Sequence, residues 1–274
     1  MENIPHPSAL LSDEFLSRLI AELDDDSVIA IILHGSYARG TALPPYSDVD
    51  IVRILKETPG RIQDRKFLWR EGYLLNLTSR PLSLYREWLT LPQQAIFRVS
   101  SIQDAQILLD KDGKFHAFQQ EMRHWRWEPL QPAADAYASQ LMVEETEIIL
   151  KLFKALTLHD QIALSDMVSD LFSAVTEAVA VQRGVLIRSG NTYFHQVQEA
   201  IGRDSKWTYY HLRTAGISPR TSSPPSIEER GVAAFQLYKE TTQLLQSHIL
   251  PEHRETIARS IQMIEQISPS ENIP

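Results

Sequence analysis

Two aspartates separated by one residue, Asp48 and Asp50, are the side chains of this sequence best suited to chemistry. They stand at the start of an extended apolar segment, where the two-residue period of a strand turns both carboxylates to the same face. Neighbouring carboxylates repel each other and lose solvation unless a cation lies between them. Mg²⁺ is the natural cation, because it accepts carboxylates and leaves positions open for phosphate oxygens. The pair therefore predicts a metal site.

A Gly-Ser turn, Gly35 and Ser36, precedes the aspartates and offers the complementary groups. Glycine lets the backbone approach a ligand closely, and a serine hydroxyl with amide donors at a helix start can hold phosphates. Either an Asp-x-Asp or a Gly-Ser alone is common in surface turns. Their order favours Mg²⁺-nucleotide and phosphoryl chemistry, because a buried strand, Gly-Ser, a polar span, Ser-Asp-x-Asp and a second strand follow one another.

The elements that must position these residues follow from the hydrophobic periodicity. Ser12 can cap a helix over residues 13–24. The apolar, β-branched run 28–33 is too short for a helix and predicts a buried central strand. Residues 49–55 alternate as a second strand, and residues 71–78 predict a third.

The pattern becomes helical from about residue 84 onward. Ser226 and Glu229 form a capping box, and the segment 216–225 is the best candidate for a connector. The layout therefore predicts a small α/β domain followed by a helical one, with the boundary near 125–135. The clearest helical ranges are 134–156, 162–182, 231–247 and 251–267.

Composition narrows the class of protein. The 274 residues are 43% hydrophobic, as in ordinary globular proteins, and the absence of cysteine excludes disulfides and thiolate metal sites. No apolar run approaches the ~20 residues that span a bilayer, and the N-terminus lacks the pattern of a signal peptide. The formal net charge of −8 argues against nucleic acid as a partner. We expect a soluble, cytoplasmic protein with no membrane partner.

The motif GSYARG at 35–40, followed by SDVD at 47–50, resembles the signature of the polymerase-beta-like nucleotidyltransferase superfamily. It looks most like the antibiotic nucleotidyltransferases of the kanamycin, streptomycin and lincosamide kinds. The run AQILLDKDG at 105–113 is similar to the segment that closes their catalytic domain. The resemblance implies an α/β (α+β) catalytic domain with a small mixed sheet, over residues 1–128. An all-α domain for acceptor binding or dimerisation would follow over residues 129–274.

The resemblance also implies the chemistry: two Mg²⁺ ions, and transfer of a nucleoside monophosphate to a hydroxyl with release of pyrophosphate. Asp48 and Asp50 would bind the metals and act in catalysis. Ser36 would contact the β- or γ-phosphate, and Gly35 would let the chain pass under it. Arg39 would either neutralise phosphate charge or pair with a carboxylate. The residues assigned to the nucleotide site are Gly35, Ser36, Arg39 and Ser47.

The superfamily usually supplies a third carboxylate from the next strand, and this sequence has no acid there. Asn76 is a neutral donor that cannot take a proton at neutral pH. Glu71, just before the strand, is one alternative base. Glu144 and Glu145 are others, in a run similar to the helix from which kanamycin nucleotidyltransferase supplies its base; adjacent helical residues point about 100° apart, so at most one faces the site. The last alternative is a weak or inactive enzyme.

We therefore expect a Mg²⁺-dependent nucleotidyltransferase that uses an NTP, with ATP as the expected donor, and a hydroxylated small molecule as acceptor. An aminoglycoside or lincosamide antibiotic is one such acceptor, since the acidic balance fits a polycation. Residues 207–213 either line an acceptor pocket or belong to the core. The alternatives are a protein or tRNA acceptor, as in toxin–antitoxin pairs, and a regulatory module that only binds nucleotide. Relatives that build the site at a dimer interface make a homodimer an open alternative.

Overall fold

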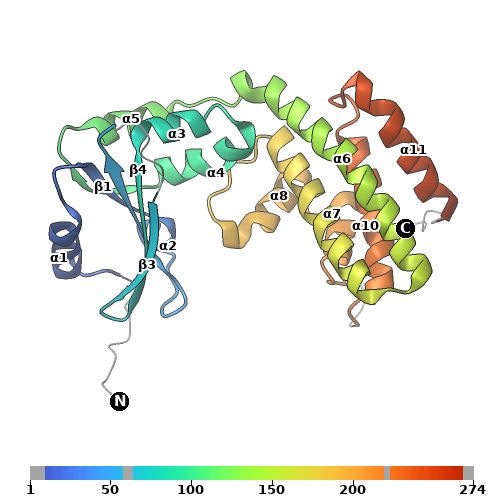
Figure 1. The fold of residues 1–274 in the computed structure, drawn as a ribbon, viewed down its shortest axis with the longest axis horizontal. Helices are drawn as coiled ribbons and strands as arrows, with labels where there is room; N and C mark the ends of the chain where they lie inside the picture. Colours follow the sequence, from blue (N-terminus) through green and yellow to red (C-terminus); the bar gives the residue numbers. More distant parts are fainter. Residues whose placement is uncertain (1–9, 58–63, 219–222, 268–274) are drawn as a thin grey trace, which may run out of the picture. The chain divides into compact units, whose positions relative to one another are not determined.

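The computed structural model describes residues 10–57, 64–218 and 223–267, and the chain divides into two units (Figure 1). The first unit contains Met1–Trp127 and Leu186–Asn191, and the second contains Glu128–Val185 and Thr192–Pro274. The short return of Leu186–Asn191 to the first unit had no signal in the sequence. It is tied there by a backbone hydrogen bond of 2.7 Å from the Ile187 amide to the Ile96 carbonyl.

A five-stranded mixed sheet forms the centre of the first unit, with the strand order β3-β4-β2-β1-β5. β2 and β4 run parallel, whereas the other neighbours are antiparallel. This sheet and the helical second unit confirm the predicted fold class. The strands are β1 (Val28–His34), β2 (Val49–Leu55), β3 (Asp64–Arg70), β4 (Tyr73–Pro81) and β5 (Gln106–Asp110).

The three predicted strands are present as β1, β2 and β4, but β3 and β5 were not predicted as strands. β3 is an edge strand that is exposed at nearly every position, so it lacks the alternation of a half-buried strand. β5 is a short edge strand inside a region whose pattern suggested only helices. Edge strands depend on pairing with a neighbour rather than on their own apolar pattern.

Helices cover both faces of the sheet. Ser12 caps α1 as predicted, with its hydroxyl accepting the Phe15 amide at 3.1 Å. α1 packs on one face, where Phe15 and Leu19 join the residues of one hydrophobic core. α3, α4 and α5 pack on the other face around Tyr85, Val99 and Phe115. The helices of this unit are α1 (Asp13–Leu23), α2 (Gly35–Ala38), α3 (Leu82–Trp88), α4 (Pro92–Gln103) and α5 (Lys114–Arg123).

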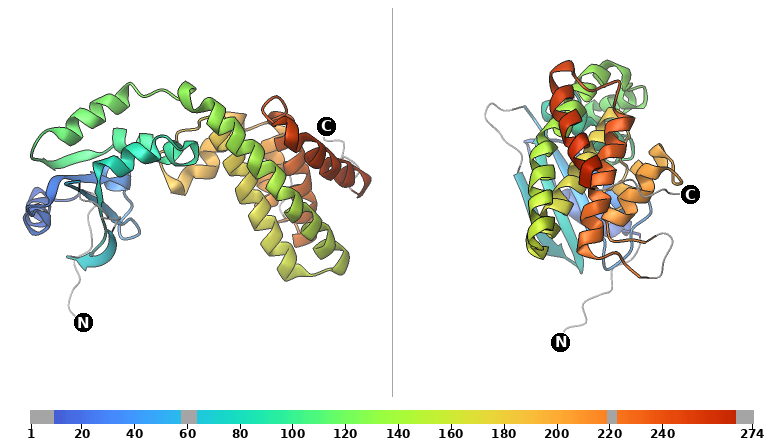
Figure 2. Two further views of the ribbon diagram at one scale, coloured as in Figure 1. Left: turned by 45° about the horizontal axis from the view of Figure 1, so that its top comes forward. Right: turned by 90° about the vertical axis from the view of Figure 1, so that its right-hand side faces the viewer.

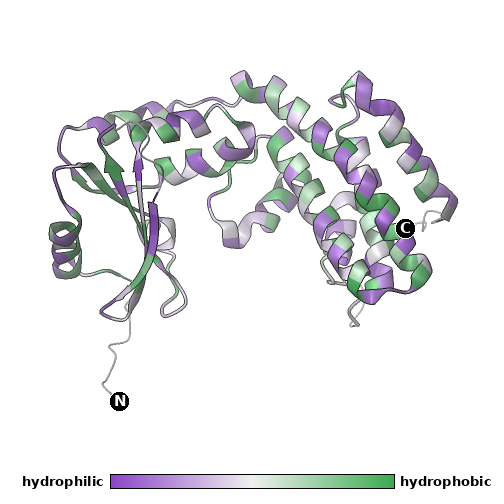
Figure 3. Cartoon of the chain, viewed as in Figure 1, coloured by the Kyte–Doolittle hydropathy of each residue, from purple (hydrophilic) through white to green (hydrophobic). Residues whose placement is uncertain are grey.

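The second unit is wholly helical in its described part, which matches the periodicity of the sequence. α6 and α7 form an antiparallel hairpin that turns at His159, which has a positive φ of 54° (Figures 1 and 2). Hydrophobic and hydrophilic residues alternate along the helices (Figure 3). They are α6 (Gln131–Leu158), α7 (Gln161–Gln182), α8 (Tyr193–Ile201), α9 (Lys206–Thr214), α10 (Ile227–Leu244) and α11 (Pro251–Ile267).

The capping box of Ser226 and Glu229 starts α10 as predicted, four residues before the expected range. The connector candidate 216–225 falls partly outside the described residues, at 219–222, and its described ends lie within the second unit rather than between the units. No helix in the described part of the chain has the length and apolar character needed to cross a membrane.

Candidate functional site

The aspartate pair stands where β2 begins, and the sheet places one neighbour on each side of Asp50. Asp50 is opposite His34 of β1 and opposite Asn76 of β4. Directly paired residues of neighbouring strands share a face of the sheet, so these three side chains point the same way. Farther along β2, Val52 and Ile54 of this face pack under α3, α4 and α5. The site is therefore the open, polar end of an otherwise covered sheet face.

Gly35 brings the backbone against the carboxylate of Asp50. Its φ is +74°, a conformation that side-chain-bearing residues rarely adopt. A Cβ at this position would lie 2.2 Å from Oδ2 of Asp50, well inside van der Waals contact. Only glycine therefore permits this approach of the β1–α2 turn to the carboxylate.

The loop between Gly35 and the aspartates is held by its own hydrogen bonds. The Thr41 amide donates to the Ser36 carbonyl at 2.9 Å. The Ser47 hydroxyl accepts the Leu43 amide at 2.8 Å, so Ser47 shapes the loop that enters β2. Arg39 lies near enough to Asp50 for its charge to lower the pKa of that carboxyl. The structure thus brings all four residues assigned to the nucleotide site into one turn-and-loop segment of the first unit.

Asn76 occupies the strand position where the superfamily usually has an acid, and its amide is fully engaged. Its Nδ2 donates to Oδ1 of Asp50 at 2.6 Å, and its Oδ1 accepts from Nε of Arg65 at 2.8 Å. A carboxamide in this arrangement orients Asp50 but takes no proton. Asn76 is therefore a positioning group, and Arg65, which the sequence did not single out, supports it.

The pKa of the Asp50 carboxyl is raised above its ordinary value. Burial, followed by the charge of Asp48, raises the pKa of Asp50 to about 6, against the opposing effects of Asn76, Arg65 and Arg39. A bound cation would remove this repulsion. Within residues 10–57, 64–218 and 223–267 no group of three histidine, cysteine or acidic side chains could hold a metal ion. Two carboxylates still fit Mg²⁺, which commonly binds one or two of them and completes its shell with water and phosphate oxygens.

Glu71 is not near this site, so the alternative that made it the base is wrong. It lies in the β3–β4 turn, and its carboxylate forms an ion pair of 2.9 Å with Arg18. It precedes β4, and Asn76 is the fourth residue of that strand. The register of β4 therefore places Asn76, and not Glu71, opposite Asp50.

Glu144 and Glu145 lie on α6, in the second unit, and differ in their surroundings. Glu144 is exposed and accepts a hydrogen bond of 2.7 Å from Gln140. Glu145 is half-buried, and its buried Oε2 has no hydrogen-bond partner among the described residues. Burial, followed by the charges of Asp170 and Glu144, raises the pKa of Glu145 to about 7. Of the two, Glu145 has the proton affinity of a general base.

Two arginines that the sequence did not single out lie on the same sheet face as Asp50. Arg80 follows Asn76 by four residues in β4 and is only 5% exposed. Its guanidinium lies over the ring of Trp88, with 4.9 Å from Cζ to the ring centroid, and that of Arg98 lies 4.5 Å from the same centroid. The signal that could have found Arg80 is its two-residue alternation with Asn76 along the strand.

His34 of β1 stands directly opposite Asp50 in the sheet. Its Nδ1 is 3.4 Å from the Ser101 hydroxyl of α4. Burial, followed by the charges of Arg80 and Arg98, lowers the pKa of His34 to about 4, so the imidazole is neutral at physiological pH. A neutral, packed histidine agrees with a role in positioning rather than in proton transfer.

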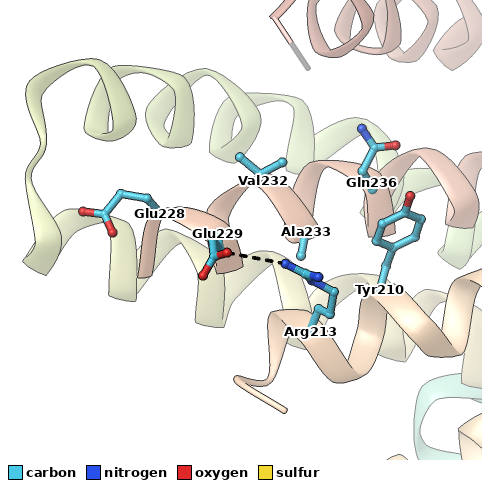
Figure 4. Close-up of a pocket in the computed structure, with 7 residues that line it drawn as sticks. All are labelled: Tyr210, Arg213, Glu228, Glu229, Val232, Ala233 and Gln236. Atoms are coloured by element: carbon cyan, nitrogen blue, oxygen red, sulfur yellow. Dashed lines mark ion pairs between the residues drawn. The ribbon is translucent and has the colours of Figure 1, made fainter. Parts of the chain in front are cut away.

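A separate pocket of about 240 Å³ lies between α9 and α10 of the second unit (Figure 4). Arg213 reaches across it toward Glu229, with 3.9 Å between Nη2 and Oε1. Trp207, at the start of the segment that was expected to line an acceptor pocket or join the core, is 1% exposed and belongs to the core. The pocket is lined by Tyr210, Arg213, Glu228, Glu229, Val232, Ala233 and Gln236.

Comparison with known proteins finds similar sequences and structures. Residues 16–108 match the family model described as a nucleotidyltransferase domain. A Methanocaldococcus jannaschii protein with the provisional name of a protein adenylyltransferase is 51% identical over 59 residues, which is 22% of this chain and 39% of that protein. The chain thus spans about two fifths of that curated relative's length. The crystal structure of a nucleotidyltransferase-like protein from Exiguobacterium sibiricum is 13% identical, covers 94% of this chain and 79% of its own, and has a TM-score of 0.47.

Proposed function

We propose that this protein transfers a nucleoside monophosphate from an NTP to a hydroxyl group, which the match of residues 16–108 to the nucleotidyltransferase domain model supports. The observation that carries this proposal is the pair Asp48 and Asp50 with the backbone of Gly35 pressed against the second carboxylate. A partly buried carboxylate beside a second carboxylate costs stability, and a cationic ligand that binds both carboxylates explains the arrangement.

Asp48 and Asp50 are proposed to hold the Mg²⁺ ions. When bound, these ions would neutralise the carboxylates and bind oxygens of the triphosphate. Ser36 and Arg39 are proposed to contact the phosphates, and Gly35 to leave room for them. Ser47 would act through the loop that it closes, since its hydroxyl is engaged by the Leu43 amide.

In the proposed reaction the acceptor hydroxyl oxygen forms a bond to the α-phosphorus. The bond from that phosphorus to the bridging oxygen of the β-phosphate breaks, and pyrophosphate leaves with the electron pair. The hydroxyl proton passes to a base. Glu145, whose pKa lies at about 7, is the proposed base, with Glu144 as the weaker alternative because it is exposed.

The proposed donor is ATP and the proposed acceptor is a hydroxylated small molecule, which the second unit would bind. A protein hydroxyl is the second candidate acceptor. It is favoured by the name of the M. jannaschii relative, which describes that protein as an adenylyltransferase acting on protein. The same name supports adenylyl rather than another nucleotidyl group.

The test is Mg²⁺-dependent release of pyrophosphate from each of the four nucleoside triphosphates, with panels of hydroxylated small molecules and of candidate proteins. We expect release from ATP that depends on one acceptor and is lost in the double variant Asp48→Asn/Asp50→Asn. Asp112→Asn is the matched control, because that carboxylate is exposed and pairs only with Lys114. Transfer that survives the double variant would contradict the proposal. Binding of nucleotide without any release would favour a regulatory module.

A further inference from the structure

Arg80 and Arg98, termed here the arginine pair, are positive charges without a carboxylate partner among the described residues. Arg80 is buried and Arg98 is half-buried. Neither forms an ion pair with a carboxylate in the described part of the chain. The Nε of each guanidinium is buried and has no hydrogen-bond partner among the described residues. Both charges instead face aromatic rings: Arg80 contacts Tyr85 and Trp88, and Arg98 contacts Trp88.

Such an arrangement is costly unless something compensates it. Removing a charge from water is unfavourable, and a cation–π contact compensates only part of that cost. The two guanidiniums also repel each other, since burial and then mutual repulsion lower the pKa of Arg98. A guanidinium with an unpaired N–H offers the fork geometry that phosphate and carboxylate groups match. The missing partner is therefore an anion.

The arginine pair lies on the face of the sheet that carries the aspartates. In the β2–β4 ladder, Asp50 is opposite Asn76 and Ile54 is opposite Arg80, so the two polar positions are four residues apart on one face. Arg98 lies three residues before Ser101 on α4, one turn away on the same helix face. Ser101 contacts His34, which stands opposite Asp50, and the charges of both arginines act on the same imidazole.

The remaining charged groups around the pair do not neutralise it. Arg65 lowers the pKa of Arg80 after burial does, which places another cation nearby. Arg39 acts on His34 with the same sign as the pair. Away from the two aspartates, this face is cationic, although the whole chain has a net charge of −8. The local field therefore repels a polycationic acceptor such as an aminoglycoside.

We propose that the arginine pair is an anion-binding subsite, which takes a phosphate or carboxylate group of a substrate. Its assignment to a substrate rests on the proposed nucleotidyl transfer. The anion has two sources, the terminal phosphates of the nucleotide or an acidic group on the acceptor. In either case the subsite binds its anion through guanidinium groups and needs no metal ion.

Trp88 provides the readout, because its ring contacts both guanidiniums. We would titrate the full chain with inorganic pyrophosphate, and separately with inorganic phosphate, in EDTA and at constant ionic strength, and follow tryptophan fluorescence. Wild-type protein is expected to show a saturable change that disappears in Trp88→Phe. Arg98→Gln is expected to weaken pyrophosphate binding by about tenfold or more, the typical effect of losing a charge-assisted hydrogen bond.

Arg86→Gln is the matched control, because Arg86 lies on α3 next to the pair but is already paired with Glu121 at 2.9 Å. Arg98→Lys keeps the charge and guards against a folding defect in Arg98→Gln. Protection of the wild type by pyrophosphate against thermal unfolding needs no variant at all. Absence of saturable binding by the wild type, or equal binding by wild type and Arg98→Gln, would overturn the proposal.

A competition arm separates the two sources. If saturating ATP in EDTA abolishes the pyrophosphate signal, and Arg98→Gln weakens ATP by about tenfold, the subsite holds the nucleotide phosphates. If phosphate still binds to the ATP-saturated protein, the subsite is open to an acidic acceptor. Because these measurements involve no turnover, failure to detect nucleotidyl transfer leaves their outcome intact, and loss of anion binding leaves the transfer assay intact.

Discussion

The helical unit buries His211 between two neutral hydrogen-bond partners. The sheet unit places the buried Arg80 and the half-buried Arg98 against aromatic rings. His211 is 1% exposed, and its Nδ1 and Nε2 lie 2.9 Å from the Gln198 amide and 3.1 Å from the Thr176 hydroxyl. Both nitrogens of the imidazole are therefore used. In the arginine pair the Nε of each guanidinium has no partner among the described residues.

The difference distinguishes polar groups that stabilise the fold from polar groups that are available to bind a ligand. A satisfied polar cluster specifies which helix faces meet, because any other packing would leave a donor or acceptor unpaired. A polar cluster whose groups lack hydrogen-bond partners can still bind a ligand. The Asp48 and Asp50 pair belongs to the second kind, since burial, followed by the charge of Asp48, raises the pKa of Asp50. We therefore expect substitutions in the sheet unit to change binding and transfer, and those around His211 to change stability.

The largest expected effect comes from Gly35→Ala. The added Cβ would meet Oδ2 of Asp50 at 2.2 Å, so the carboxylate or the turn has to move. We expect nucleotidyl transfer to fall by about 100-fold or more, as for other displacements of about 1 Å at catalytic groups. Steady-state pyrophosphate release measures this. Gly113→Ala is the matched control, because it also has a positive φ, 66°, but no atom within 4 Å of its Cβ position.

Both variants carry a backbone penalty of about 1 kcal/mol for the left-handed conformation. Only Gly35→Ala should lose transfer. Equal activities for the two proteins would mean that the contact with Asp50 has no part in the reaction.

The next effect is a loss of stability in acid that is traceable to His211. Burial lowers the pKa of His211 to about 4 in the folded protein, from 6.5. At this site the unfolded chain therefore binds more protons than the folded protein between pH 4 and 6.5. The contribution of His211 to the free energy of unfolding is fully present above pH 6.5, and it is lost as the pH decreases through this window. The loss amounts to about 3 kcal/mol for the complete shift. Protonation would also turn Nδ1 from an acceptor into a donor facing the Gln198 amide.

Denaturant unfolding at a series of pH values measures this dependence. His34 contributes with the same sign, because its pKa is also lowered to about 4. Asp50 and Glu145 contribute with the opposite sign, because their pKa values are raised to about 6 and about 7. The His211 contribution is therefore the difference between wild type and His211→Gln, and in the variant the free energy of unfolding should fall less as the pH decreases from 6.5 to 4. An unchanged slope in that variant would contradict the assignment.

The smallest effect is expected for Thr241→Val in the helical unit. The Thr241 hydroxyl accepts the indole N–H of Trp207 at 2.8 Å, and both side chains are buried. Valine preserves the shape but leaves the N–H unpaired, which costs about 1–3 kcal/mol in the free energy of unfolding. Thermal unfolding measures the cost, and the transfer rate of the folded fraction should not change. A matched Thr242→Val changes a half-buried hydroxyl that bonds only within its own helix.

Much of the fold was predictable because it depends on hydrophobic spacing and capping residues that are close together in the sequence. The run of β1 is buried on both faces, and a continuous apolar stretch is the expected signature of such a strand. The caps at Ser12 and Ser226 are formed within three residues and were found as predicted. The long helices of the second unit bury one face each, which gives the three-and-four spacing. By contrast, β3 is exposed along most of its length, so its sequence has no alternation of buried and exposed residues that would predict a strand.

One part of the candidate site was likewise predictable from local sequence, and another part was not. The spacing of Asp48 and Asp50 turns both carboxylates to one side in any extended strand, so the short motif alone pointed to a metal and a phosphorylated substrate. Which residue stands opposite Asp50 depends on the register of a parallel pair, and a parallel pair is joined through intervening chain rather than through a tight turn. That register places Asn76 there and removes Glu71 from the site. Local sequence left both of them open.

The arginine pair was decided wholly by tertiary structure. Arg80 and Arg98 are separated by eighteen positions and belong to a strand and a helix, so no period connects them. Most arginines lie on the surface, and a single sequence does not distinguish those that become buried. Their environment depends on where the end of β4 meets α3 and α4, because there both guanidiniums lie against the ring of Trp88. Short-range spacing therefore determines the chemistry of the carboxylates, whereas the packing of distant segments decides which charges face them.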